Sequence, residues 1–286
     1  MTTRRLLLTI AYDGTPWRGW QGQSHGMGIQ NKLISAMSAV AKQPVHVHGA
    51  GRTDSGVHAL AHTAHADVPT ASRITHAGWV KALNSMLPPS IRVMTCEDAP
   101  EGFHARFHAK GKIYRYRILR SAVMPPLEHN RAWHIYGPMD LGALRQCLSS
   151  IVGTHNFARL SANRGFPGER ERRANDPSTT TRNIYRAELM EHGDELIIEV
   201  EGGGFLYRMV RLILGGAMQV ARGRESLEWF QSLLSDPGGE KNNQCAPACG
   251  LYLARVLYEP RTGLVPGAEL GEQAQDLDVE PDQGDE

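Results

Sequence analysis

Leu6-Leu7-Leu8-Thr9-Ile10-Ala11-Tyr12-Asp13-Gly14 opens the part of the sequence that decides the fold. Its apolar run predicts a strand over residues 6–12, which ends at the turn pair Asp13-Gly14. Apolar residues then recur at helical spacing and predict a helix over residues 28–42, which ends before Pro44. The chain therefore begins with a strand followed by an amphipathic helix.

The rest of the first hundred residues completes a recognisable order of elements. The predicted elements are strands at residues 45–48 and 62–68 on either side of a loop, a helix at residues 74–86 and a strand at residues 91–96. The order is β-α-β-β-α-β, the split βαβ arrangement of an α+β sandwich.

The second half repeats these element types less regularly. The predictions are strands at residues 112–119, 132–136, 183–190, 195–201 and 251–258, and helices at residues 141–152, 205–220 and 227–234. We therefore expect two α+β halves, residues 1–110 and 111–260, that face each other across a cleft. An acidic disordered tail is expected over residues 261–286.

The charge is distributed unevenly along the chain. The net charge is +1, but eight acidic residues and no Lys or Arg lie in residues 269–286, so that residues 1–268 carry +9. This basic body favours a polyanionic partner. No stretch approaches the roughly 20 apolar residues of a membrane helix, and the four cysteines are scattered. A reduced, cytoplasmic location is expected.

Asp54 lies in the loop between two predicted strands, within Gly51-Arg52-Thr53-Asp54-Ser55-Gly56-Val57-His58. Asp-Ser-Gly is a common turn sequence, so Asp54 can be a purely structural residue. Two neighbours favour a functional role. Arg52 lies two residues earlier, and the small residues Gly49-Ala50-Gly51 allow another backbone to approach closely.

A second candidate is Arg211, in the predicted helix over residues 205–220. Apolar residues cover most of this helix and leave a narrow arc that includes Arg211. A partly buried guanidinium needs a carboxylate or a phosphate. The alternative is a structural ion pair, or a side chain that reaches solvent.

The run Lys112-Ile113-Tyr114-Arg115-Tyr116-Arg117 combines basic and aromatic residues in a predicted strand. Alternation places Tyr114 and Tyr116 on one face and Arg115 and Arg117 on the other. Tyr114 could stack on a nucleobase while Arg115 meets phosphates, which makes both candidates for substrate binding. The alternative is that the tyrosines belong to the core.

A metal site is disfavoured. His58 and His62 have the i, i+4 spacing of the zincin motif but lack its glutamate, and Cys245 and Cys249 have the wrong spacing for a zinc knuckle. We therefore expect no metal ion.

Several stretches together resemble the TruA-type tRNA pseudouridine synthases. They are, besides the Asp54 segment, Tyr12-Asp13-Gly14, Gly19-Trp20-Gln21-Gly22-Gln23, Phe103-His104-Ala105-Arg106-Phe107, Lys112-Ile113-Tyr114-Arg115-Tyr116, Phe205-Leu206-Tyr207-Arg208-Met209-Val210-Arg211 and Gly250-Leu251-Tyr252-Leu253. They follow the family's order and span about residues 6–258. Residues 161–178 resemble an insertion.

The resemblance implies the pseudouridine synthase fold, two halves with a mixed sheet and a central cleft, in a homodimer without cofactor. It implies activity on uridines 38, 39 and 40 in the anticodon stem-loop of tRNA. Asp54 matches the nucleophile, Tyr114 the residue that stacks on the target base, and Arg211 the ion-pair partner of the aspartate. Arg52 matches an arginine that holds the target nucleotide out of the stack.

Two other classes of function compete with this interpretation. A non-catalytic RNA-binding protein would need the basic cleft but not the carboxylate, and a metal-dependent hydrolase would use the histidines. The sequence leaves open whether Asp54 attacks the pyrimidine ring or the sugar.

Overall fold

β1 (Thr3–Tyr12) has the alternation that the sequence predicts. Leu6, Leu8 and Ile10 are fully buried and the residues between them are partly exposed. β1 pairs antiparallel with β3 and with β4. The other elements of this half are α1 (Ile29–Ala41), β2 (Val47–Gly49), β3 (His58–Pro69), α2 (His76–Met86) and β4 (Ile91–Asp98). Their order is the predicted β-α-β-β-α-β.

β5 (Gly111–Leu119) opens the second half and also alternates, with Tyr114 and Tyr116 facing inward. It is followed by η1 (Pro126–Glu128), β6 (Trp133–His134), α3 (Leu141–Ser150), β7 (Gly153–Asn156), η2 (Ala158–Leu160), β8 (Thr181–His192), β9 (Glu195–Gly202), α6 (Met209–Ala221), α7 (Leu227–Ser235), η3 (Ala248–Gly250) and β10 (Leu251–Leu257). In α6 every residue except Arg211 and Gln219 is buried, which agrees with its apolar sequence.

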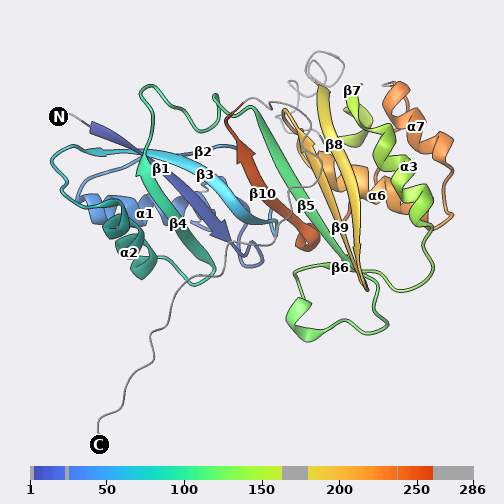
Figure 1. The fold of residues 1–286 in the computed structure, drawn as a ribbon, viewed down its shortest axis with the longest axis horizontal. Coiled ribbons are helices and arrows are strands. Elements are labelled where there is room, and N and C mark those ends of the chain that lie inside the picture. The colour runs from blue at the N-terminus through green and yellow to red at the C-terminus, as the bar shows by residue number, and fades with distance from the viewer. Residues whose placement is uncertain (1–2, 23–25, 163–179, 237, 260–286) are drawn as a thin grey trace, which may run out of the picture.

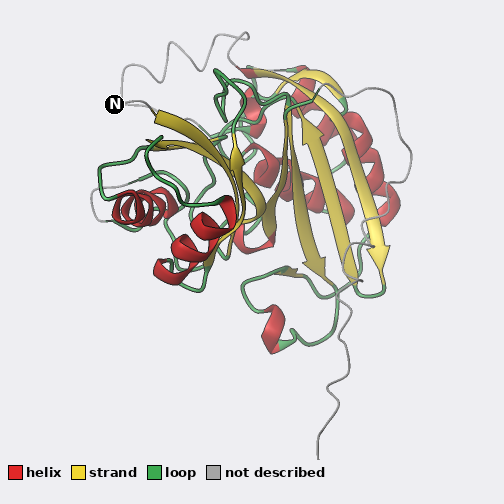
Figure 2. Cartoon of the chain, turned by 60° about the vertical axis from the view of Figure 1, so that its left-hand side comes forward, coloured by secondary structure: helices red, strands yellow, loops and turns green. Residues whose placement is uncertain are grey.

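β10 joins the two halves, because it pairs parallel with β3 and antiparallel with β5. The computed structural model, which describes residues 3–22, 26–162, 180–236 and 238–259, thus has one sheet in the order β4-β1-β3-β10-β5-β9-β8-β7. β2 is added beside β3 and β6 beside β5. Figure 1 shows α1 and α2 near the first strands and α3, α6 and α7 near the last; Figure 2 shows the strong twist of the sheet. The predicted α+β class with a mixed sheet is confirmed.

Several predicted boundaries differ from those in the structure. The helix expected over residues 205–220 begins at Met209, because Arg208 has the left-handed φ of 59° and cannot continue a helix. β3 begins at His58, earlier than the expected residue 62. The strand expected at residues 132–136 is only Trp133–His134.

The acidic tail over residues 261–286 and most of the segment at 161–178 lie outside the described residues. Within the described part, no helix has the length and apolar character needed to cross a membrane. All four cysteines are free.

Candidate active site

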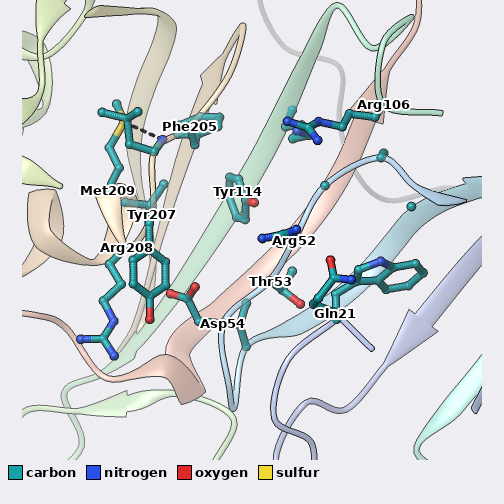
Figure 3. A pocket seen from close by; sticks show the side chains of 18 of the residues that line it. Gln21, Arg52, Thr53, Asp54, Arg106, Tyr114, Phe205, Tyr207, Arg208 and Met209 are labelled. Carbon is teal, nitrogen blue, oxygen red and sulfur yellow. Dashed lines mark hydrogen bonds between the residues drawn. The ribbon is translucent and has the colours of Figure 1, made fainter. Parts of the chain in front are cut away.

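A cleft of about 590 Å³ lies between the two halves, within the range of small-molecule sites. It is lined by the loop between β2 and β3, by the segment 104–107, by β5, and by the segment 205–211 that leads into α6. The side chains of Arg52, Asp54 and Tyr114 meet in it (Figure 3). Residues distant in the sequence thus share one cavity.

The loop that carries Asp54 is fixed by the backbone of residues 17–20. The Trp20 N–H donates to the carbonyl of Thr53 (3.2 Å), and the Gly56 N–H donates to the carbonyl of Trp17 (3.2 Å). Gly19 has a φ of 86°, and a Cβ atom there would lie 2.4 Å from the Thr53 carbonyl oxygen. Only glycine therefore allows these two segments to approach so closely.

A buried chain of polar side chains lies behind the same loop. The Tyr12 hydroxyl is 2.8 Å from Thr53 Oγ1 and 3.1 Å from His62 Nδ1. The His62 ring stacks on Trp20, with 3.8 Å between the ring centroids. Burial lowers the pKa of His62 to about 3, so the ring is neutral at physiological pH. Thr53, the neighbour of Asp54, is therefore fixed by hydrogen bonds both of its side chain, with Tyr12, and of its carbonyl, with Trp20.

The carboxylate of Asp54 is paired with Arg211, across 157 residues of sequence. Arg211 Nη1 lies 3.3 Å from Asp54 Oδ2, and each side chain is 13% exposed. Arg211 Nε donates to the carbonyl of Ala246 (2.8 Å), which fixes the direction of the guanidinium. The pair therefore presents an oriented carboxylate at the edge of the cleft.

Aromatic and basic side chains line the cleft around this carboxylate. Tyr114 is 8% exposed and meets the Phe205 ring edge to face, with 4.9 Å between the centroids. Arg52 is exposed and points toward Tyr114, while Tyr207 lies next to Asp54 (Figure 3). The cleft thus combines a carboxylate, aromatic rings and cations.

Comparison with known proteins identifies the family to which this chain belongs. A family model described as tRNA pseudouridine synthase matches residues 8–108 and 148–259. The chain belongs to the TruA family of tRNA pseudouridine synthases. The enzyme is therefore an isomerase, and the predicted resemblance is confirmed.

Three relatives illustrate the similarity of this synthase to the family. A tRNA pseudouridine synthase A of Akkermansia muciniphila is 40% identical over 90% of this chain and 96% of its own length. A tRNA pseudouridine synthase A 1 of Desulfotalea psychrophila is 38% identical, over 89% of this chain and all of its own. A tRNA pseudouridine synthase A 2 of Clostridium perfringens is 36% identical with the same coverage.

One predicted binding residue of this synthase does not reach the cleft. Arg115 Nε and Nη2 donate to Glu199 Oε1 (3.0 and 2.9 Å) on the opposite face of the sheet from Tyr114. Tyr116 belongs to the core, where its hydroxyl donates to the carbonyl of Pro247 (2.8 Å). The alternation predicted for this strand is correct, and it directs Arg115 to an ion pair.

His58 and His65 of this synthase are engaged in hydrogen bonds with the backbone. His58 Nδ1 accepts from the Gly14 N–H (3.0 Å), and its Nε2 lies 3.0 Å from the carbonyl of Asn130. His65 Nδ1 accepts from the Ala105 N–H (3.1 Å). Among the described residues, no three His, Cys, Asp or Glu side chains are placed to hold a metal ion.

Sequence reasoning missed several residues that line the cleft: Arg106, Phe107, Lys112, Phe205, Tyr207 and Arg208. All lie in stretches that carry the family resemblance. Their mixture of basic and aromatic side chains, like that around Tyr114, is the signal that could have identified them.

We expect this synthase to lose stability in mild acid. Burial lowers the pKa of His62 to about 3 and that of His65 to about 4, whereas the unfolded chain binds these protons near pH 6.5. The free energy of unfolding should therefore fall as the pH drops below about 6.5 toward 4. Urea denaturation at about pH 7.5 and pH 5 measures this.

A His46→Gln variant is the matched control, because His46 is exposed. It should show the same difference between the two pH values as the wild type. Equal stability of the wild type at both pH values would contradict the neutral, buried state of His62 and His65.

Proposed function

We propose that the enzyme converts uridines 38, 39 and 40 in the anticodon stem-loop of tRNA to pseudouridine, with Asp54 as nucleophile. The observation that carries this proposal is the Asp54–Arg211 pair at 3.3 Å, opposite Tyr114 in a cleft lined by cations. The relatives' name, tRNA pseudouridine synthase A, supports tRNA as the substrate.

The reaction requires few chemical groups. The C1′–N1 bond of the target uridine breaks, a C1′–C5 bond forms, and the proton lost from C5 is balanced by one gained at N1. A carboxylate can attack the ring or the sugar to hold the intermediate, and Arg211 orients it by a charge-assisted hydrogen bond. No electrons are exchanged with another molecule.

Access to the target base requires that the nucleotide leave the helical stack. We propose that Tyr114 stacks on the extruded base and that the exposed Arg52 occupies the space that the base vacates. The presence of both side chains in the cleft with Asp54 supports these roles. Arg115 is not part of this proposed site, because its guanidinium pairs with Glu199. Following the family resemblance, we also propose a homodimer that acts in the cytoplasm.

Mapping of pseudouridine tests the proposed function. Purified enzyme is incubated with unmodified tRNA, pseudouridine is labelled chemically, and the labelled positions are read by primer extension. Labels at positions 38–40 are the expected result. Labels elsewhere would refute the proposed positions, and their absence from every tRNA would refute the proposed substrate.

Turnover should survive exhaustive chelation of metal ions. The isomerisation exchanges no electrons, and the rings of His58 and His65 are already engaged in hydrogen bonds. Initial rates on a stem-loop RNA before and after dialysis against a chelator measure this. A rate that falls on dialysis and returns with one added metal would contradict the prediction.

A further inference from the structure

The loop between β4 and β5 is anchored firmly beside the cleft. Phe103 and Ala105 are buried. The other three residues of this stretch, His104, Arg106 and Phe107, line the cleft. The Tyr258 hydroxyl donates to the carbonyl of Ala105 (2.8 Å). The outward side chains of this loop are therefore carried by a fixed backbone.

Phe107 is a large apolar side chain that is 72% exposed at the cleft. Its ring stacks on His104, with 4.2 Å between the centroids and 28° between the planes. His104 Nδ1 in turn accepts from the N–H groups of Arg106 (3.2 Å) and Phe107 (3.3 Å). The exposed ring is thus held in place before any ligand arrives, which lowers the entropic cost of stacking on it.

One cation lies beside this ring, and a second lines the same cleft. The guanidinium of Arg106 is 5.8 Å from the centre of the Phe107 ring. Lys112 lies two residues before Tyr114 on β5 and lines the same cleft. Burial, and then the charge of Arg106, lower the pKa of Lys112.

The surroundings of Lys112 favour an anion. A Cβ atom on Gly51 would lie 3.0 Å from Lys112 Nζ, so the loop of Asp54 passes directly over the ammonium group. Among the described residues, no carboxylate forms an ion pair with Lys112. Lys112 is half-buried. A partly desolvated charge without a carboxylate partner is costly, and a phosphodiester entering the cleft would reduce that cost.

We propose that Phe107, Arg106 and Lys112 form a second nucleotide subsite, for a nucleotide adjacent to the target uridine. Phe107 stacks on the base of that nucleotide, and Lys112 with Arg106 binds its phosphate. The subsite rests on the proposed function, because the adjacent nucleotide is part of the same RNA. With this subsite, the cleft would bind two successive unstacked nucleotides of the RNA, the target uridine at Asp54 and its neighbour at Phe107.

A cycle of protein and RNA changes tests this subsite. The affinity of Phe107→Ala and Phe107→Trp for an anticodon stem-loop is measured by fluorescence anisotropy, in an Asp54→Asn background that keeps the RNA unmodified. The same measurements use stem-loops with an abasic residue on the 5′ or the 3′ side of the target. Tyr136→Ala is the control, since Tyr136 is 67% exposed and lies outside the residues that line the cleft.

Phe107→Ala should bind the intact stem-loop about tenfold more weakly than the Asp54→Asn parent. Phe107→Trp and Tyr136→Ala should bind it with the same affinity as the parent. On one of the two abasic RNAs the Phe107→Ala effect should disappear, which identifies the stacked base. Lys112→Met should reduce the salt dependence of log Kd by about one unit of slope.

The proposal is overturned if Phe107→Ala binds like the parent, or if its loss is the same on intact and on both abasic RNAs. These outcomes concern affinity alone. Failure of the proposed function would appear instead as absence of pseudouridine with the wild-type enzyme.

Discussion

Asp54→Asn is expected to abolish isomerisation while the affinity for tRNA changes by no more than a few-fold. The substitution keeps the size of the side chain and removes the nucleophilic oxygen. Affinity should persist because the cations that line the cleft, Arg52, Arg106, Lys112 and Arg208, are unchanged, and contacts of such cations with phosphates supply most of the binding energy.

Release of tritium from C5 of labelled uridine in tRNA measures the turnover, and filter binding measures the affinity. Asp194→Asn is a matched control, because Asp194 is exposed in the turn between β8 and β9. It should have wild-type activity. Turnover of Asp54→Asn above about 1% of the wild-type rate would exclude Asp54 as the nucleophile.

Arg211→Met should reduce turnover by orders of magnitude with a much smaller effect on tRNA binding. Methionine is apolar and nearly as long, so it suits a helix whose other residues are almost all buried. If the ion pair were purely structural, this replacement would cost little stability and little activity. Loss of the 3.3 Å contact instead removes Arg211 as an orienting partner of the Asp54 carboxylate.

The conservative variant separates these two roles. Arg211→Lys keeps the charge but lacks the planar guanidinium whose Nε and Nη1 donate in fixed directions to the Ala246 carbonyl and to Asp54, so only partial activity should return. Arg222→Met is the control, since Arg222 is exposed at the C-terminal end of α6. Single-turnover rates and melting temperatures are compared for all three. Near wild-type turnover of Arg211→Met would refute the role and leave Arg52 as the next candidate cation.

Local sequence patterns predicted much of the fold. β1 and β5 are buried on one face, and this gives an apolar alternation that is visible in the sequence. α6 is buried on nearly all sides, and its sequence is correspondingly apolar throughout. The place of β10 between β3 and β5 was not predicted, because strand pairing at long range leaves no local signal. β7, Gly153–Asn156, was missed because it has no apolar alternation.

The candidate site was predictable only in part. Asp54 and Arg211 were separate candidates from their local surroundings, but their pairing came from the family resemblance, since 157 residues separate them. Alternation correctly directed Arg115 to the other face of the sheet, yet only the structure supplies its partner Glu199. The basic and aromatic run that contains Lys112 is visible in the sequence, but its approach to the backbone of Gly51 depends on tertiary packing.

The position of β10 also has a consequence for the order of events during synthesis. Residues 251–257 leave the ribosome after every other strand that the structure describes, yet they lie between β3 and β5. The carbonyl of Ala246, which fixes Arg211, emerges only slightly earlier. Asp54 and Arg211 therefore meet only when translation is nearly complete, so that incomplete chains carry no assembled active site.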